Sequence, residues 1–299
     1  MPTAFEQAVY RTVAYFDAFR YPLTAFEIWK FLLEPQEAVT LHQVRELLSS
    51  SPFLRKRFIA WRGFYSLRDT PEFVRERGVR FVDAVRKYRK AVWYARLIAR
   101  LPYVRSIAIC NSLAFFHTNK ESDIDLFIVS EPGRVWTTRL LTTLPARLFR
   151  LRPGEAKRDP ICLSFFADEK HLPCASLKAQ ERDPYLAYWL ATLVPLYGDA
   201  VFRKLREENA WVREALPHVE AVRVCTQYQK PVRFVWPWAF FKERFARKVQ
   251  EHRLPPEIVR IMNVDTRVVV HDGMLKFHEN DRRAYYAAKL RRHEERAFS

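Results

Sequence analysis

Two aspartates inside an apolar run constrain this chain more than any other feature. In ESDIDLFIV, residues 121–129, Asp123 and Asp125 stand one residue apart. Side chains alternate along a β-strand, so both carboxylates would share one face while Ile124 and Leu126 share the other. Two ionised carboxylates side by side repel each other unless a cation lies between them, and Mg²⁺ accepts carboxylates together with substrate phosphates. The pattern predicts a metal site or, alternatively, an ordinary strand end whose polar side faces water.

The sequence upstream of the pair favours the metal site. An apolar strand, SIAIC, precedes Asn111 and Ser112, and ten residues separate Ser112 from Asp123. This order resembles the nucleotidyltransferase superfamily related to DNA polymerase β, in which an apolar strand, a Gly-Ser turn, a short helix and an Asp-x-Asp strand follow one another. The resemblance implies that Asp123 and Asp125 hold Mg²⁺, or Mn²⁺, while Asn111 and Ser112 bind the phosphates of a nucleoside triphosphate at a helix N-terminus, which favours anions.

The chain departs from the pattern of that superfamily in two places. Asn111 replaces the glycine, although asparagine tolerates positive φ better than most residues. Many members carry a third carboxylate on a neighbouring strand, here PICLSFFADE. A period of two would place Cys162, Ser164, Phe166 and Asp168 on one face. Ser164 occupies the expected position of the acid, so Asp168, at the strand end, is the candidate third catalytic carboxylate.

Further candidates for binding the nucleotide surround the motif and lie near the end of the chain. MLKFHENDRR, residues 274–283, contains several cations and His278, a possible acid or base. The alternative for this segment is a helix N-terminus capped by Asn280 or Asp281. The residues expected to contact the nucleotide, besides Asn111 and Ser112, are Lys120, Ser122, Lys276, Arg282 and Arg283.

The first part of the chain divides into a small unit and a basic helix. Residues 1–70 read as three helices followed by a hairpin around Arg62-Gly63, an order similar to that of a winged-helix domain. Asp69-Thr70-Pro71 then predicts the start of a long helix, assigned to 71–102 as a connection. Residues 72–105 hold ten Lys and Arg against three Asp and Glu. This surface could face the phosphates of DNA or RNA, or could be an ordinary solvated helix face.

The rest of the chain predicts an α+β fold. Residues 103–200 alternate strands and helices, ending in an apolar helix over PYLAYWLATLVPLY, and resemble the mixed sheet of the nucleotidyltransferase domain with flanking helices. Residues 201–299 are expected to be mostly helical, with loops around CTQYQKPVRFVWP and NVDTRVVVHDGMLKFHENDRR. In this superfamily a helical segment after the catalytic domain often closes the cleft, so Arg182 or Tyr185 could border it. The helix containing them is otherwise expected to be core.

Composition narrows the classes of function. The net charge of +17 favours a polyanionic partner. The six glycines are too dispersed for GxGxxG or a P-loop, which excludes dinucleotide-dependent redox chemistry and Walker-type hydrolysis. We expect no membrane span, no disulfides and a cytoplasmic protein.

Together these observations predict a nucleotidyltransferase that transfers a nucleoside monophosphate from a nucleoside triphosphate to an unidentified acceptor. The alternative is a nucleic-acid-binding regulator whose transferase domain has lost its chemistry, as Asn111 and the missing mid-strand acid would allow. The acceptor could equally be a nucleic acid, a protein or a small molecule, because acceptor choice depends on loop shape rather than on motif spacing.

Overall fold

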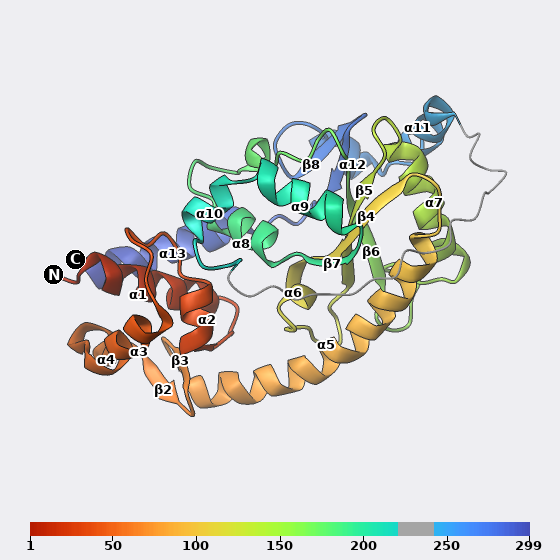
Figure 1. Cartoon of the computed structure of the whole chain (residues 1–299). Coiled ribbons are helices and arrows are strands. Elements are labelled where there is room, and N and C mark those ends of the chain that lie inside the picture. Colours follow the sequence, from red (N-terminus) through yellow and green to blue (C-terminus); the bar gives the residue numbers. More distant parts are fainter. Residues whose placement is uncertain (221–241) are drawn as a thin grey trace.

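The computed structural model describes residues 1–220 and 242–299 and has an α+β fold (Figure 1). The chain begins with a small unit in which short strands pair as an antiparallel sheet in the order β1-β3-β2. Threonines begin three of its helices: Thr3, Thr24 and Thr40 each form a capping box with the glutamate or glutamine three residues later. The elements of this unit are α1 (Ala4–Asp17), β1 (Leu23–Thr24), α2 (Ala25–Lys30), α3 (Leu41–Ser50), α4 (Pro52–Arg57), β2 (Ile59–Trp61) and β3 (Phe64–Ser66).

A single long helix, α5 (Thr70–Ile98), leads from this unit to the central sheet (Figure 1). Pro71 stands at its first turn, as the sequence predicted. Several of its cations are bound internally. Arg77 pairs with Glu27 of α2, and Arg86 pairs with Asp159 before β6. Part of the positive charge of α5 is therefore used in ion pairs that connect the helix to the N-terminal unit and to the segment before β6.

The central sheet has six strands in the order β7-β4-β5-β6-β9-β8. Only the pairing of β5 with β6 is parallel, and the other neighbours are antiparallel. The strands are β4 (Val104–Ile109), β5 (Ile124–Ser130), β6 (Ile161–Asp168), β7 (Val194–Tyr197), β8 (Val268–His271) and β9 (Met274–Phe277).

The two faces of this sheet belong to different cores. Ile124, Leu126 and Ile128 of β5 pack in one core with residues of α5 and α7 (Val135–Leu148). Phe127 and Val129 pack in the other core, with α8 (Pro184–Thr192), α13 (Arg283–Phe298) and the N-terminal unit. The remaining helices of the described chain are α6 (Asn111–Ala114), the 3-10 helix η1 (Ala175–Leu177), α9 (Asp199–Glu208), α10 (Trp211–Ala215), α11 (Glu243–Glu251) and α12 (Pro256–Ile261).

The structure corrects two predictions about the second half of the chain. The apolar helix expected over 184–197 ends at Thr192, and β7 follows and pairs with β4. The loop expected around 263–283 contains the β8–β9 hairpin, turning at Asp272-Gly273, and β9 extends the central sheet beside β6. The described residues of 201–299 include five helices, α9 to α13, and the β8–β9 hairpin that completes the sheet. The loop expected over CTQYQKPVRFVWP lies outside the described residues.

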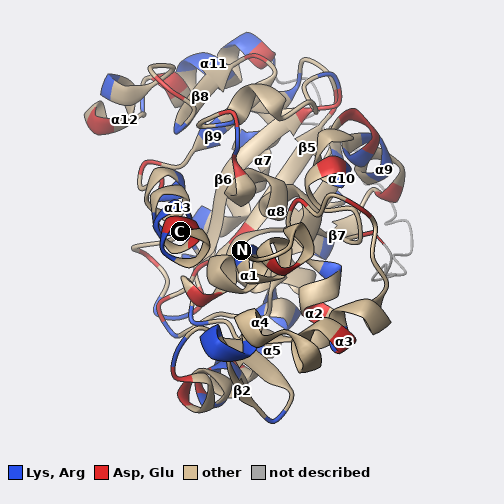
Figure 2. Cartoon of the chain, turned by 90° about the vertical axis from the view of Figure 1, so that its left-hand side faces the viewer, with Lys and Arg blue, Asp and Glu red and all other residues tan. Residues whose placement is uncertain are grey.

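Helices from the two ends of the chain pack against each other (Figures 1 and 2). Tyr10 of α1 donates a hydrogen bond to the carbonyl of His293 in α13, and Arg11 pairs with Glu294. Arg182 joins Glu294 to Glu34 of the N-terminal unit. These contacts hold the N-terminal unit against α13 and the segment before α8.

Within the part of the chain that the structure describes, no helix has the length and apolar character needed to cross a membrane.

Candidate active site

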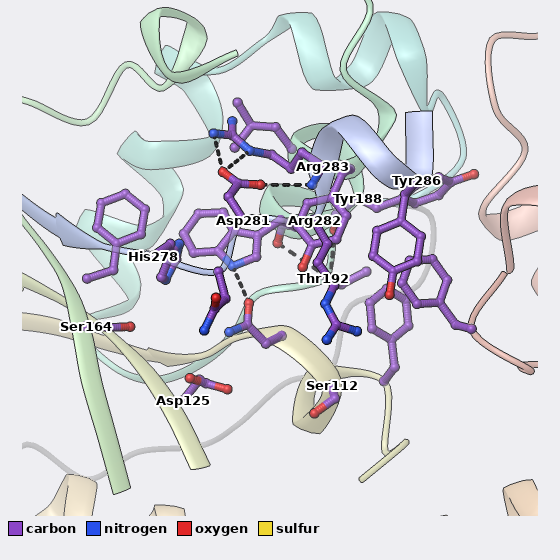
Figure 3. Close-up of a pocket in the computed structure, with 18 of the residues that line it drawn as sticks. Ser112, Asp125, Ser164, Tyr188, Thr192, His278, Asp281, Arg282, Arg283 and Tyr286 are labelled. Atoms are coloured by element: carbon purple, nitrogen blue, oxygen red, sulfur yellow. Dashed lines mark hydrogen bonds and ion pairs between the residues drawn. The ribbon is translucent and has the colours of Figure 1, made fainter. Parts of the chain in front are cut away.

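A cavity of about 680 Å³ is lined by residues of the central sheet, α8, the start of α13 and the N-terminal unit. Both aspartates of the motif line it, together with Ser164. Figure 3 shows how Ser112, Asp125, Ser164 and Arg282 lie around it. The predicted site residues that line the cavity are Asn111, Ser112, Asp123, Asp125, Lys276, Arg282 and Arg283.

Asp123 and Asp125 stand at the start of β5, and both are partly exposed. Strand alternation places them on the same face as Phe127, away from Ile124 and Leu126. Burial raises the pKa of Asp125 to about 6, and the charge of Asp123 adds to the rise. Burial also raises the pKa of Asp123, against the opposing effect of Lys87. These raised values show that the charged carboxylates lack a full complement of positive partners, which a hard cation such as Mg²⁺ would supply.

Asn111 has a φ of +57°. The tolerance of asparagine for positive φ predicted from the sequence is therefore confirmed. Its side chain bridges two parts of the site. The Oδ1 atom accepts a hydrogen bond of 3.0 Å from the indole of Trp189, and the side chain also hydrogen-bonds Asp125, lowering the pKa of that carboxyl. Asn111 thus contacts the carboxylate of Asp125 as well as forming the turn before Ser112.

The three predicted cations of 274–283 have different roles. Lys276 and Arg283 are buried, with 4% and 6% of their surface exposed. Lys276 donates to the carbonyls of Thr266 and Arg267, and burial and the nearby Arg283 lower the pKa of its ammonium group to about 8. Neither side chain is free to bind a phosphate.

Arg283 forms ion pairs with Asp281 at 2.6 Å and with Asp183 at 3.4 Å, linking the start of α13 to the start of α8. Arg282, by contrast, is exposed, and its guanidinium has no hydrogen bond or ion pair with any residue of 1–220 or 242–299. Arg282 is therefore the predicted cation of this segment that remains available to an anionic ligand.

His278 also lines the cavity. Burial, and then the charge of Lys276, lower the pKa of its imidazole to about 3. A neutral ring with so low a pKa is a weak base at neutral pH. Its position suits hydrogen bonding to a ligand better than the proton transfer considered from the sequence.

Asp168 does not fit the role of third catalytic carboxylate. Asp125 is paired with Cys162 but Phe127 with Phe165, so β6 contains one extra residue at this point. The bulge shifts the alternation, and Phe165 rather than Phe166 packs on the face of Phe127.

Asp168 also lies at the opposite end of β6, where its carboxylate accepts hydrogen bonds from the backbone N–H groups of Gly133 and Lys170 and from His171. It holds loops together away from the cavity. Ser164, beside the bulge, lines the cavity in the place where the sequence pattern would have an acid.

Lys120 and Ser122, both predicted to contact the nucleotide, lie in the loop before β5 and do not line the cavity. The hydroxyl of Ser122 donates to Asn119, whose backbone N–H donates back to that hydroxyl. Lys120 is exposed. Their contribution to the site would be to shape the loop that carries Asp123.

A residue that the sequence analysis did not single out supports the same loop. Lys87 of α5 is completely buried and donates a hydrogen bond of 2.6 Å to the carbonyl of Asn119. It also pairs with Asp83 at 3.0 Å and Asp159 at 3.3 Å. Its position in the sequence could have indicated that it is buried, because Lys87 lies on the same face of the helix as the buried Ala84 and Ala91.

The N-terminal unit supplies part of the cavity, which the sequence analysis also missed. Its contribution is aromatic. Tyr185 of α8 borders the cavity, as the sequence suggested, whereas Arg182 does not. The cavity residues from the N-terminal unit are Tyr15, Phe16, Phe19 and Tyr21.

Comparisons with known proteins add no assignment to this geometry. No family model matches the chain, and searches of curated proteins and of solved structures found no significant similarity. Among the described residues, no group of three or more His, Cys, Asp and Glu is arranged to hold a metal ion. A cation at Asp123 and Asp125 would therefore need oxygen ligands from a substrate or from water.

Proposed function

We propose that this protein is a nucleotidyltransferase that uses Mg²⁺ held by Asp123 and Asp125. The observation that carries the proposal is the convergence of three features in one cavity: the carboxylate pair, the Asn111-Ser112 turn, and the exposed cation Arg282. Mg²⁺ is commonly bound by one or two carboxylates together with substrate phosphates, which suits a site with two protein ligands.

In the proposed reaction an acceptor oxygen forms a bond to the α-phosphorus of a nucleoside triphosphate. The bond between the α-phosphorus and the bridging oxygen breaks, and pyrophosphate leaves. Bound Mg²⁺ would supply the charge neutralisation that phosphoryl transfer requires. Ser112 and Arg282 would bind and orient the phosphates, while Asn111 keeps Asp125 in position.

Two features of the fold agree with this reading. The strand order of the central sheet places the Asp-x-Asp strand, β5, between the strand that leads into Asn111-Ser112 and the strand that carries Ser164. In the N-terminal unit, the order of the helices and the β1-β3-β2 sheet support the resemblance to a winged helix.

The experiment that tests the proposal is a thermal-shift titration with ATP, GTP, CTP and UTP, each with and without Mg²⁺. A ligand at 100 times its Kd stabilises the folded state by about 2.7 kcal/mol. We expect a Mg²⁺-dependent stabilisation that disappears in the Asp123→Asn/Asp125→Asn double variant. Asp199→Asn, on the exposed start of α9, is the matched control and should respond like the wild type. The absence of a response to all four nucleotides would contradict the proposal.

Nucleic-acid binding is the second candidate function, and the exposed residues of α5 favour it. Trp93 is 50% exposed, and the exposed Arg89 and Arg96 lie within one turn of it. Cations beside an exposed aromatic ring suit a nucleic-acid strand. Arg86 and Lys90, by contrast, are bound to the segment before β6.

The N-terminal unit adds little positive charge to this candidate. The exposed face of α3 carries Glu46 beside Arg45, and the ribbon in Figure 2 has acidic as well as basic residues around α2 and α3. An Arg89→Gln/Arg96→Gln variant should weaken RNA or DNA binding and reduce its salt dependence. Unchanged binding would remove this candidate.

A further inference from the structure

Aromatic rings from four parts of the chain line the same cavity. Phe19 follows α1, Phe115 follows α6, Tyr185 lies on α8 and Tyr286 lies on α13. The ring centroids of Phe19 and Tyr286 are 4.3 Å apart, and those of Tyr185 and Tyr286 are 5.9 Å apart. All four side chains remain partly exposed, so they present ring surface to the cavity rather than filling it.

The residues lie in a definite order along the cavity. In Figure 3, Asp125 and Ser164 lie at one side, Tyr286 lies at the other, and Ser112 and Arg282 lie between them. A nucleoside triphosphate bound to a metal ion has the same order of chemical groups: metal and phosphates, then sugar, then a flat aromatic base. Tyr286, with the ring of Phe19 beside it, therefore lies where the base would be, if the phosphates are bound as proposed above.

A buried polar group beside Phe19 has a ring nitrogen without a partner among the described residues. His117 lines the cavity with only 7% of its surface exposed, and its Nδ1 atom has no hydrogen bond within the described part of the chain. Its Nε2 atom lies 2.6 Å from the guanidinium of Arg80 and 3.1 Å from the carbonyl of Phe19. A guanidinium can only donate, so the shorter contact favours Nε2 as acceptor and a proton on Nδ1. A buried donor without a partner is costly, so this ring is a polar group of the cavity wall whose hydrogen-bonding capacity is only partly used within the described residues.

We propose that Phe19 and His117, together with Phe115 and Tyr286, form a subsite for the nucleobase of the donor nucleotide. The N-terminal unit then completes the nucleotide site instead of acting only as a separate nucleic-acid-binding domain. This inference rests on the proposed function for the identity of the ligand, but the ring-binding subsite can be tested by itself.

The test measures binding by calorimetry for three probes: the four nucleoside triphosphates with Mg²⁺, inorganic tripolyphosphate with Mg²⁺, and the four nucleosides. The variants are Phe19→Leu and Tyr286→Leu, which keep an apolar side chain but remove a ring. Phe58→Leu is the matched control, because Phe58 is a partly buried aromatic of the N-terminal unit that stacks on Tyr10 outside the cavity. Base–aromatic stacking is worth about 1–3 kcal/mol, so at least a 5-fold loss of nucleotide affinity is expected.

The outcomes separate this inference from the proposed function. The nucleobase subsite is supported if both cavity variants bind the preferred nucleotide more weakly than the wild type does, while their affinity for tripolyphosphate is unchanged and Phe58→Leu binds like the wild type. The subsite is overturned if nucleotide affinity stays at the wild-type value, or if the affinities for nucleotide and tripolyphosphate fall equally. If a nucleoside binds and loses affinity in the variants while tripolyphosphate fails to bind, the subsite stands and the phosphate-transfer proposal falls. If none of the probes binds to the wild type, both are refuted.

Discussion

Replacing Asp125 with asparagine should stabilise the metal-free protein at neutral pH while abolishing Mg²⁺-dependent nucleotide binding. Burial raises the pKa of this carboxyl from 3.8 to about 6 in the folded state. A carboxyl whose pKa is raised by folding favours the folded state when protonated. That contribution is complete below about pH 4 and is lost as the pH rises through about 6. Asparagine is neutral at every pH, so the variant does not lose stability as the pH rises through this range.

The size of the expected stabilisation follows from the shift in the pKa of Asp125. Each pKa unit corresponds to about 1.4 kcal/mol, so ionised Asp125 costs about 3 kcal/mol. Because the side chain is partly exposed to the cavity, solvent screening reduces the expected effect to about 2 kcal/mol. In a chain of this length that would raise the melting temperature by about 4 °C.

The assay is thermal unfolding in EDTA from pH 4 to pH 8. The difference between Asp125→Asn and wild type should be close to zero at pH 4, grow around pH 6 and level off above pH 7. Asp168→Asn is the control with the opposite sign. Burial opposes its ionisation, but hydrogen bonds from Gly133 and His171 lower the pKa of Asp168 overall, so its loss should destabilise the protein at neutral pH and matter less in acid. A pH-independent difference, or a less stable Asp125→Asn variant at pH 7.5, would refute the reasoning.

Substitutions at three other positions test the supports of the site and of the sheet. Lys87→Met should cost about 3 kcal/mol in urea unfolding because Asp83 and Asp159 lose a buried cation, and a loss below about 1 kcal/mol would show that the network does not need Lys87. Gly198→Ala should lower the melting temperature markedly, since an added Cβ would collide with the backbone carbonyl of Arg105 and the positive φ strains any other residue; a wild-type melting temperature would contradict that geometry. Asn111→Ala should destabilise the protein by about 1–2 kcal/mol more than Asn111→Gly, because both variants lose the hydrogen bonds but only alanine is strained at positive φ. Equal melting temperatures for those two variants would refute the strain argument.

Local patterns in the sequence predicted the polar side of the site. The period of two along 121–129 placed Asp123 and Asp125 on one face, and the preference of asparagine for positive φ predicted the turn at Asn111. Pro71 similarly predicted the start of α5. Each prediction depends on interactions within a few residues, which the sequence displays directly.

Features that depend on partners far along the chain were not predictable in the same way. The bulge in β6 is invisible in PICLSFFADE, yet it changes which residues share a face with Asp125 and excludes Asp168. Lys276 and Arg283 were predicted to be phosphate ligands because their partners in the fold, such as Thr266 and Asp183, cannot be recognised from the sequence.

The aromatic wall supplied by Phe19 likewise depends on how the N-terminal unit packs on α13. Local sequence does not specify that contact, because Phe19 and Tyr286 are separated by most of the chain. Long-range packing of this kind limits any prediction of ligand class from motif spacing alone.

The packing of α1 against α13 has a consequence for protein synthesis. A chain leaves the ribosome N-terminal end first, so α1 emerges long before the helix on which it packs. Until α13 has been made, Tyr10 and Arg11 lack their partners His293 and Glu294, and Phe19 lacks Tyr286. The cavity can therefore close only after α13 has been translated. Until then a nascent chain would hold the carboxylate pair but lack the wall formed by Phe19 and Tyr286, so ligand binding should depend on the synthesis and docking of α13.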